Sequence, residues 1–424
     1  ITCDEQTTAK AVREFFRIEA STRYPSLCWL GSDALDNVTL RDLHLSDALS
    51  DQRTTLFGSD ACISSCDRNP DSIGDRHNDI ALLGTIQRVA DIVSSSIGEF
   101  NIVEWKAKHG PGAVSDQRSG ISKYLFPHWP EKLNRVFPMD LLAFANMSFW
   151  VDSLTDKTPD DPLLSEHEPP AKLIAVPKTQ KGPRLIASEP TAHQWCQQMV
   201  NNFLRHHVKS TWMSDSIHFR DQEFNKQGAL LASQTGTHWT IDLSSASDCL
   251  SLWLVERIFR RNVSLLGALH ASRTRWIDNT ISPESHRYHI LKKLAPQGAA
   301  FTFPVQSIVY LIIIVGCMIH EAGLDVNYDN ITEAGREVLV FGDDLIVPNI
   351  AGETVVKVLP YLGFLVNHTK TFGIGRFRES CGMDAYDGVD VTPAYILEPY
   401  DDLRPTSVAS VVECSNNFFM KGFW

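Results

Sequence analysis

The 424-residue sequence predicts a fold that mixes α-helices with β-strands. Apolar residues recur at helical spacing over residues 80–95, which is typical of a helix with one buried face. Residues 308–319 are almost entirely apolar and predict a buried helix. Two β-type runs, 338–341 and 345–347, flank Gly342-Asp343-Asp344 and predict a β-hairpin with a glycine-containing turn.

The N-terminal half is divided by residues 154–170, a stretch rich in proline and aspartate that predicts a surface loop. The helix over residues 80–95 lies before this loop. After it, Leu173–Val176 predicts a strand that Pro177 would end, and residues 185–187 predict a second short strand.

In the C-terminal half, His238–Ile241 predicts a short strand that leads directly into Asp242. Apolar residues then return at helical spacing, so a helix is expected over residues 248–259. Ser247 would act as the N-cap of that helix, because serine oxygens accept hydrogen bonds from the free N–H groups of a first turn.

The formal net charge of −12, taken alone, argues against a nucleic-acid partner, because phosphates favour basic surfaces. A net charge is a sum, however, and a local groove can oppose it. The window 172–184 carries four basic side chains and no acidic one, namely Lys172, Lys178, Lys181 and Arg184. These residues are equally compatible with a solvated turn, so charge by itself leaves a nucleic-acid partner open.

The apolar run over residues 308–319 is shorter than a bilayer span, which needs about twenty residues, so we expect no membrane association. The nine cysteines are scattered at irregular spacing, which argues against a disulfide framework and favours a reducing, cytoplasmic compartment. Cys62 and Cys66 have no matching downstream pair, so a zinc site is not expected there.

Two adjacent aspartates at a hairpin tip are costly as structure alone, because their charges repel and the flanking apolar strands reduce solvent. A divalent cation would remove that cost, and carboxylate oxygens suit magnesium. Two-metal phosphoryl transfer needs carboxylates from several elements, and Asp242, at a strand end, is the natural second supplier. Gly-Asp-Asp by itself is more often an ordinary polar turn, so the motif needs support from the rest of the chain.

The order of residue types along the chain gives that support. The series is Asp242, Asp248, Gly298, Thr302, Gln306, Gly342-Asp343-Asp344 and Lys370. It resembles, in order and residue type, motifs A, B, C and D of the right-hand polymerase palm, and residues 172–184 resemble motif F of the fingers. The Gly-Asp-Asp form is typical of RNA-templated RNA polymerases rather than of reverse transcriptases.

Longer stretches narrow the resemblance. Residues 377–396 (FRESCGMDAYDGVDVTPAYI), 109–113 (HGPGA) and 174–190 (IAVPKTQKGPRLIASEP) resemble the replicases of single-stranded RNA bacteriophages of the Q-beta type, the leviviruses. The resemblance is clear over about residues 105–115 and 172–400.

The resemblance implies roles for the matching residues. Asp242 and Asp343 match the metal-binding aspartates, and Asp344 matches a third, less direct carboxylate. Asp248 matches the residue that senses the incoming ribose, and Gly298 matches the flexible glycine of the motif B loop.

Other implied roles have open alternatives. Lys178, Lys181 and Arg184 would meet the triphosphate. Lys370 is a candidate proton donor to pyrophosphate, but it is equally compatible with an exposed loop lysine. Gln306, which stands where many animal-virus polymerases have asparagine, could line a polar pocket for the ribose together with Thr302, or could only pack against the palm.

The resemblance also implies an α+β right-hand polymerase with fingers, palm and thumb and an antiparallel palm sheet. The expected boundaries are residues 1–100 for an N-terminal region supporting thumb and fingers, 101–235 for fingers, 236–376 for the palm with a fingers insertion near 260–295, and 377–424 for motif E and the thumb. The chain is shorter than familiar phage replicases, which leaves its peripheral regions undefined.

The implied activity is template-directed RNA synthesis with two Mg²⁺ ions, for which Mn²⁺ could substitute. The implied partners are RNA template and product, nucleoside triphosphates, the host elongation factors Tu and Ts, and a ribosomal RNA-binding protein, in the cytoplasm of an infected bacterium. Two alternatives stay open at this point: a polymerase resembling reverse transcriptases, and a non-catalytic RNA-binding or scaffold subunit that keeps the palm fold.

Overall fold

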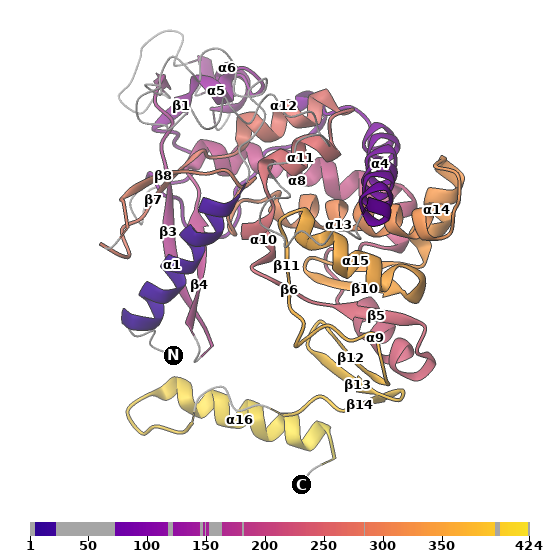
Figure 1. Cartoon of the computed structure of the whole chain (residues 1–424). Coiled ribbons are helices and arrows are strands. Elements are labelled where there is room, and N and C mark those ends of the chain that lie inside the picture. Colours follow the sequence, from indigo (N-terminus) through magenta and orange to yellow (C-terminus); the bar gives the residue numbers. More distant parts are fainter. Residues whose placement is uncertain are drawn as a thin grey trace.

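The computed structural model describes residues 5–22, 73–117, 122–144, 147–148, 150–151, 163–179, 182–283, 285–394 and 399–422. In this part of the chain, helices and five small sheets of two to four strands mix along the sequence, as expected for an α+β fold (Figure 1). Shorter elements outside the site are η5 (Ile102–Glu104), β1 (His128–Pro130), α6 (Met139–Leu142), β2 (Leu163–Ser165), η6 (Trp212–Asp215) and α14 (Tyr328–Arg336).

The sheet that carries the two aspartates of the predicted hairpin has three antiparallel strands. Its order is β5 (His238–Ile241), β10 (Asp344–Pro348) and β9 (Leu339–Phe341), with β10 in the middle. Helices α9 (Glu223–Thr235) and α15 (Asn349–Tyr361) pack against these strands. Both the strand before Asp242 and the hairpin are therefore confirmed.

The buried apolar helix predicted before residue 320 is α13 (Thr302–Glu321), and it is longer than the apolar run alone suggested. It packs against α4 (Ile73–Ser96), where a Cβ at Gly316 would lie only 2.7 Å from a side-chain carbon of Ile86. By length and composition α13 could cross a membrane, but 94% of its most apolar window is buried inside the fold. That burial, rather than the length of the run, is the pattern of a core helix.

A four-stranded sheet lies on the left in Figure 1, in the order β4 (Gly182–Ser188), β3 (Ala171–Thr179), β7 (Trp276–Asp278) and β8 (Tyr288–Ile290). Helix α1 (Glu5–Ser21) packs on β4 (Figure 1). The expectation that Pro177 ends the first strand is wrong. Strand β3 continues to Thr179, because the register shifts between Val176 and Thr179 and so admits a proline at the irregularity.

The single helix expected over residues 248–259 is divided into α10 (Ala246–Cys249) and α11 (Leu252–Ile258). The predicted cap, Ser247, lies inside α10. Ser251 is the N-cap instead, since its side chain accepts a hydrogen bond from the N–H of Leu254. The apolar spacing is continuous across the break, which is why periodicity alone did not reveal it. The next helix along the chain, α12 (Val263–Ser272), packs against α8 (Thr191–Ser210).

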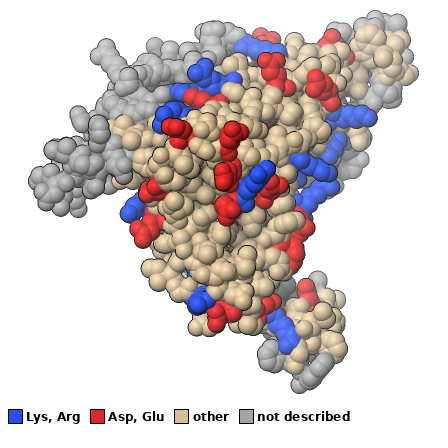
Figure 2. All heavy atoms as spheres, turned by 90° about the vertical axis from the view of Figure 1, so that its right-hand side faces the viewer, with Lys and Arg blue, Asp and Glu red and all other residues tan. Residues whose placement is uncertain are grey.

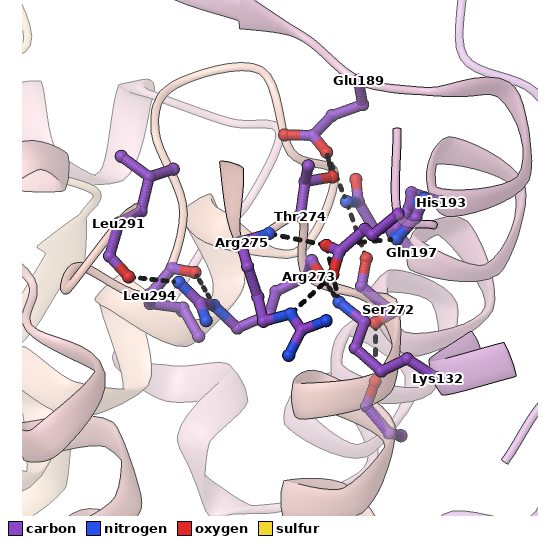
Figure 3. Close-up of polar contacts among 12 residues, drawn as sticks. Lys132, Glu189, His193, Gln197, Ser272, Arg273, Thr274, Arg275, Leu291 and Leu294 are labelled. Atoms are coloured by element: carbon purple, nitrogen blue, oxygen red, sulfur yellow. Dashed lines mark hydrogen bonds and ion pairs between the residues drawn. The ribbon is translucent and has the colours of Figure 1, made fainter. Parts of the chain in front are cut away.

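A buried ionic network joins four segments that are distant in sequence (Figure 3). Glu168 accepts hydrogen bonds from Lys132 of α5 (Glu131–Asn134) at 2.8 Å and from the guanidinium of Arg275 at 2.6 Å. His193 of α8 is fully buried beside this carboxylate, with 3.6 Å between Nε2 and Oε1. Burial acts to raise the pKa of Glu168, but the charges of Lys132 and Arg275 lower it well below its ordinary value.

The chain then forms a three-stranded meander of β12 (Phe377–Ser380), β13 (Met383–Tyr386) and β14 (Val389–Asp390), which packs on α9. Arg378 and Glu379 are neighbours on β12 but have different partners, since Glu379 pairs with Lys370. Arg378 is buried and donates to four backbone carbonyls, of His238, Gly373, Gly375 and Phe377. Helix α16 (Pro405–Met420) lies below this meander in Figure 1.

Charged side chains on one face of the molecule are of both signs. Figure 2 shows lysine and arginine interspersed with aspartate and glutamate over that face. This distribution fits a chain whose net charge of −12 is the difference between 39 basic and 51 acidic residues.

Candidate active site

Asp242 and the Gly342-Asp343-Asp344 turn meet at one end of the β5–β10–β9 sheet. Leu345 lies opposite Ile241 in the antiparallel register, so the next positions along the two strands are Asp344 and Asp242. Asp343 lies at the exposed tip of the hairpin. Gly342 has a φ of +64°, and a Cβ there would lie 2.7 Å from the ring of Phe303, so both the turn and the packing require glycine.

Asp242 is half-buried and is held by the segment that follows β11 (Leu365–Val366), a strand paired with β6 (Leu243–Ser244). The side-chain amide of Asn367 donates to Oδ2 of Asp242 at 2.7 Å. Burial raises the pKa of Asp242 and the charge of Asp343 adds to this, while the hydrogen bond from Asn367 opposes it. A carboxylate whose charged form is disfavoured by burial and by a neighbouring carboxylate is stabilised by a bound cation.

Asp344, expected as a third metal carboxylate, faces a different partner. Its Oδ1 accepts the backbone N–H of Cys381 at 3.1 Å, and the Cys381 thiol lies 3.5 Å from Oδ2. Burial raises the pKa of Asp344 to about 6, and the charges of Asp343 and Asp242 act in the same direction. Among the described residues, no three His, Cys, Asp or Glu side chains are gathered as a ready metal cage.

Lys370 lies at the same end of the sheet. Its ammonium donates to Glu379 of β12 at 2.5 Å, and this hydrogen bond is the largest cause of a raised pKa of Lys370. The negative charge of Asp242 also raises the pKa of Lys370, which places the two groups within electrostatic reach. The lysine is half-exposed and stays protonated at neutral pH.

Asp248 is paired with a buried lysine. Lys293 is fully buried and its ammonium lies 3.0 Å from Oδ1 of Asp248 and 3.4 Å from Oε2 of Glu19 on α1. The same ammonium stands 3.5 Å from the ring centroid of Phe15. The predicted ribose sensor is therefore also part of the contact between α1 and α10.

The segment before α13 is joined to β4. Gly298 has a φ of +125°, and a Cβ there would lie 2.0 Å from the carbonyl oxygen of Ala187. The N–H of Ala187 in turn donates to the carbonyl of Gln297 at 2.6 Å. Thr302 and Gln306 follow on the first turns of α13, where both are buried. The structure thus brings the basic hairpin and the Gly298 segment together.

The basic residues predicted to meet a triphosphate belong to the β3–β4 hairpin. Arg184 lies on β4 opposite Val176, and its side chain is exposed. Lys178 lies on β3, but its side chain, like the whole of Lys181, is outside the described residues.

Four neighbours of the site were missed by the sequence analysis, namely Lys293, Asn367, Glu379 and Cys381. Asn367 lies three residues before Lys370, and Glu379 and Cys381 lie within the stretch that resembles phage replicases. These positions lie in stretches that resemble polymerase motifs, and this resemblance could have pointed to them. Which side chains they contact depends on pairing with residues distant in the sequence.

Sequence comparison finds relatives of this chain among the RNA polymerases of RNA phages. A sequence profile of the family described as RNA replicase, beta-chain, matches residues 142–411. The RNA-directed RNA polymerase subunit beta of Escherichia virus Qbeta is 32% identical over 281 residues, covering 65% of this chain and 43% of that protein. The RNA-directed RNA polymerase beta chain of Escherichia phage MS2 is 34% identical over 231 residues, covering 54% of this chain and 38% of that protein.

Among solved structures, an insertion-loop deletion mutant of the RNA-dependent RNA polymerase of a human picobirnavirus aligns with a TM-score of 0.40 and 13% identity. It covers 58% of this chain and 53% of that chain, a likeness too distant to carry an argument. The chain spans less than half the length of the two phage proteins that it matches. Because the family profile covers more than half of its residues, the chain belongs to the RNA replicase beta-chain family.

Proposed function

We propose that this chain carries out RNA-templated RNA synthesis, in which an RNA 3′-hydroxyl attacks the α-phosphate of a nucleoside triphosphate and pyrophosphate leaves. The observation that supports this most strongly is the meeting of Asp242 and Asp343 at one end of the palm-like sheet, in a member of a replicase family. Such chemistry depends on positioning and on charge neutralisation, and it needs no histidine base.

Asp242 and Asp343 would hold two Mg²⁺ ions, for which Mn²⁺ could substitute. Burial and the charge of Asp343 both raise the pKa of Asp242, and this supports a cation beside these carboxylates. When bound, the metal would lower the pKa of the attacking hydroxyl and stabilise the leaving pyrophosphate. Asp344 would act less directly, because Cys381 engages both of its oxygens.

The other residues would bind and orient the substrate. Lys178, Lys181 and Arg184 would meet the triphosphate, and Lys370 would donate a proton to pyrophosphate from its place beside Glu379. Gly298 would let its segment adjust to the template. Asp248, Thr302 and Gln306 would read the ribose, and the burial of the last two fits a site that hydrogen-bonds a hydroxyl.

The proposed division of the chain follows the same reasoning. Residues 101–235 would form fingers, 236–376 the palm with a fingers insertion near 260–295, and 377–424 motif E with thumb elements, while 1–100 would support thumb and fingers. Contacts of α1 with β4 and of Lys293 with Glu19 support a bracing role for the described part of the N-terminal region.

The proposed partners are RNA and nucleoside triphosphates, together with host elongation factors Tu and Ts and a ribosomal RNA-binding protein in a bacterial cytoplasm. The names of the phage relatives support RNA and nucleotides, and the host proteins rest on the resemblance alone. Affinity capture of the tagged chain from bacterial lysate, with Asp343→Asn as a folded inactive reference, would test them. A fully active, processive chain free of host protein would contradict an obligate complex.

The decisive experiment is RNA synthesis on a cytidine-rich template with GTP and Mg²⁺, comparing the wild-type chain with Asp242→Asn, Asp343→Asn and Asp344→Asn. We expect losses of several orders of magnitude for the first two and a milder loss for the third. A parallel reaction with dGTP separates RNA synthesis from reverse transcription. Absence of synthesis by a folded wild-type chain, with host factors added, would contradict the proposal, as would near-normal synthesis by Asp343→Asn.

A further inference from the structure

Two consecutive turns of the β12–β13–β14 meander share one backbone geometry. Ser380 pairs with Met383 across Cys381-Gly382, and Tyr386 pairs with Val389 across Asp387-Gly388. All four central residues have positive φ, namely 51° and 76° in the first turn and 49° and 81° in the second. Positive φ at both central positions is the pattern of a type I′ hairpin turn.

The two turns differ in the residue that takes the first left-handed position. Asp387-Gly388 is one of the pairs that such turns prefer. Cysteine is not among the preferred residues, because its side chain forms no hydrogen bond with the neighbouring backbone that would stabilise the left-handed conformation. Strain at a single position of a fold is a reason to look for what that side chain does.

The side chain of Cys381 faces Asp344. Its thiol lies 3.5 Å from Oδ2 while its backbone N–H donates to Oδ1 at 3.1 Å, so both carboxylate oxygens are engaged by one residue. Asn225 of α9, fully buried, donates to the carbonyl of Asp344 at 3.2 Å and lies 3.4 Å from the hydroxyl of Ser380. The Cys381-Gly382 turn and the end of the hairpin at Asp344 are thus joined by several hydrogen bonds.

We propose that Cys381 is a positioning residue that holds the carboxylate of Asp344 in place beside the Asp242–Asp343 pair. The left-handed turn directs both the backbone N–H and the thiol of Cys381 toward the same carboxylate. Glycine and alanine have no side-chain group that could make the second contact. This inference rests on the proposed RNA synthesis for its catalytic consequence, but the contact itself does not depend on that activity.

The test compares Cys381→Ala with Cys381→Ser, two variants that keep the same backbone strain and differ in the hydrogen-bond donor. In primed elongation we expect Cys381→Ala to lose roughly tenfold in kcat with KM for nucleotide within about twofold, because one hydrogen bond to a charged group is lost. Cys381→Ser should restore most of the rate. Cys381→Gly, which relieves the strain, should melt no lower than wild type and still be slow.

Asp387→Gly is the matched control, since it relieves the same strain in the neighbouring turn and removes only an exposed ion pair with Arg376. It should elongate RNA like wild type. Equal rates for Cys381→Ala, Cys381→Ser and wild type would overturn the proposal.

Thermal melts of Cys381→Ala, Asp344→Ala and the double variant give a readout that needs no activity. Non-additive losses would support the contact even if the wild-type chain made no RNA, in which case only the proposed synthesis would fail. Additive losses would overturn the positioning role whatever the activity.

Discussion

Asn367 holds Asp242 from two directions. Its side-chain amide donates to Oδ2 of Asp242 at 2.7 Å, and its backbone N–H donates to the carbonyl oxygen of Asp242 at 2.9 Å. The two residues are 125 positions apart in sequence, so this relationship exists only because β11 pairs with β6. One asparagine therefore fixes both the strand end and the orientation of a carboxylate expected to bind metal.

Asn367→Ala should slow RNA elongation by about tenfold to a hundredfold, because a hydrogen bond to a charged group contributes about 1.5–3 kcal/mol. The backbone contact would remain, so the melting temperature should change little. Elongation rate and thermal melts are measured together. The control is Asn330→Ala on α14, which removes a side-chain hydrogen bond to the backbone carbonyl of Asp325 and should leave the rate unchanged. An unaffected rate in Asn367→Ala would show that Asp242 is oriented without this amide.

Asp248→Ala should destabilise the chain by about 2–4 kcal/mol, because the fully buried Lys293 would lose the nearer of the two carboxylates that pair with it. The double variant Asp248→Ala with Lys293→Met should recover much of that loss, since an uncompensated buried charge is replaced by an apolar side chain. Denaturant unfolding measures both. If the single variant is as stable as wild type, the pair contributes nothing to the fold.

The same Asp248→Ala chain tests sugar selection. We expect the ratio of GTP to dGTP incorporation efficiency to fall, because a site that hydrogen-bonds the 2′-hydroxyl rejects the deoxy analogue strongly. Gln306→Ala is the companion variant. Its ratio of GTP to dGTP incorporation should fall if Gln306 contacts the ribose and should stay unchanged if Gln306 only packs on α13. A ratio that is unchanged in both variants would mean that the sugar is read by other residues.

Gly298→Ala should abolish or greatly reduce synthesis and lower the melting temperature by several degrees, because its Cβ would lie 2.0 Å from the carbonyl oxygen of Ala187. Gly375→Ala is a matched control: Gly375 also has a positive φ, of +77°, but a Cβ there would meet nothing within 4 Å. The difference between the two variants isolates the collision from the backbone strain. Equal melting temperatures and rates would contradict the close approach.

Stability should fall as the pH drops below about 6. Burial, with the charge of Lys132, lowers the pKa of His193 from 6.5 to about 3, so between these values the unfolded chain binds a proton that the folded chain does not. This favours unfolding by up to about 1.4 kcal/mol per pH unit. The lowered pKa of Glu168 acts in the same direction below about pH 4.5.

Denaturant unfolding of wild type and His193→Phe between pH 7 and pH 4 measures this dependence. The variant should lose much of the slope, whereas His286→Gln, at an exposed histidine, should keep it. Parallel slopes for wild type and His193→Phe would contradict a neutral, buried His193.

The sequence by itself determined the local elements. Patterns of neighbouring residues predicted the strand before Asp242, the hairpin around Asp343 and the apolar helix α13. Hydrophobic periodicity and turn residues act directly on local backbone conformation. The order of motif residues also indicated the family that the sequence profile later matched.

Only the tertiary structure decided which side chains meet. Cys381 reaches Asp344 across 37 positions and Lys293 reaches Asp248 across 45, and neither pairing leaves a periodic trace in the sequence. The break between α10 and α11 and the passage of β3 through Pro177 were likewise set by long-range contacts, such as the bonds of Leu252 to Lys292 and of Leu294 to Leu250. Local patterns fix backbone conformation, whereas partners depend on strand register and helix packing, which the whole chain determines at once.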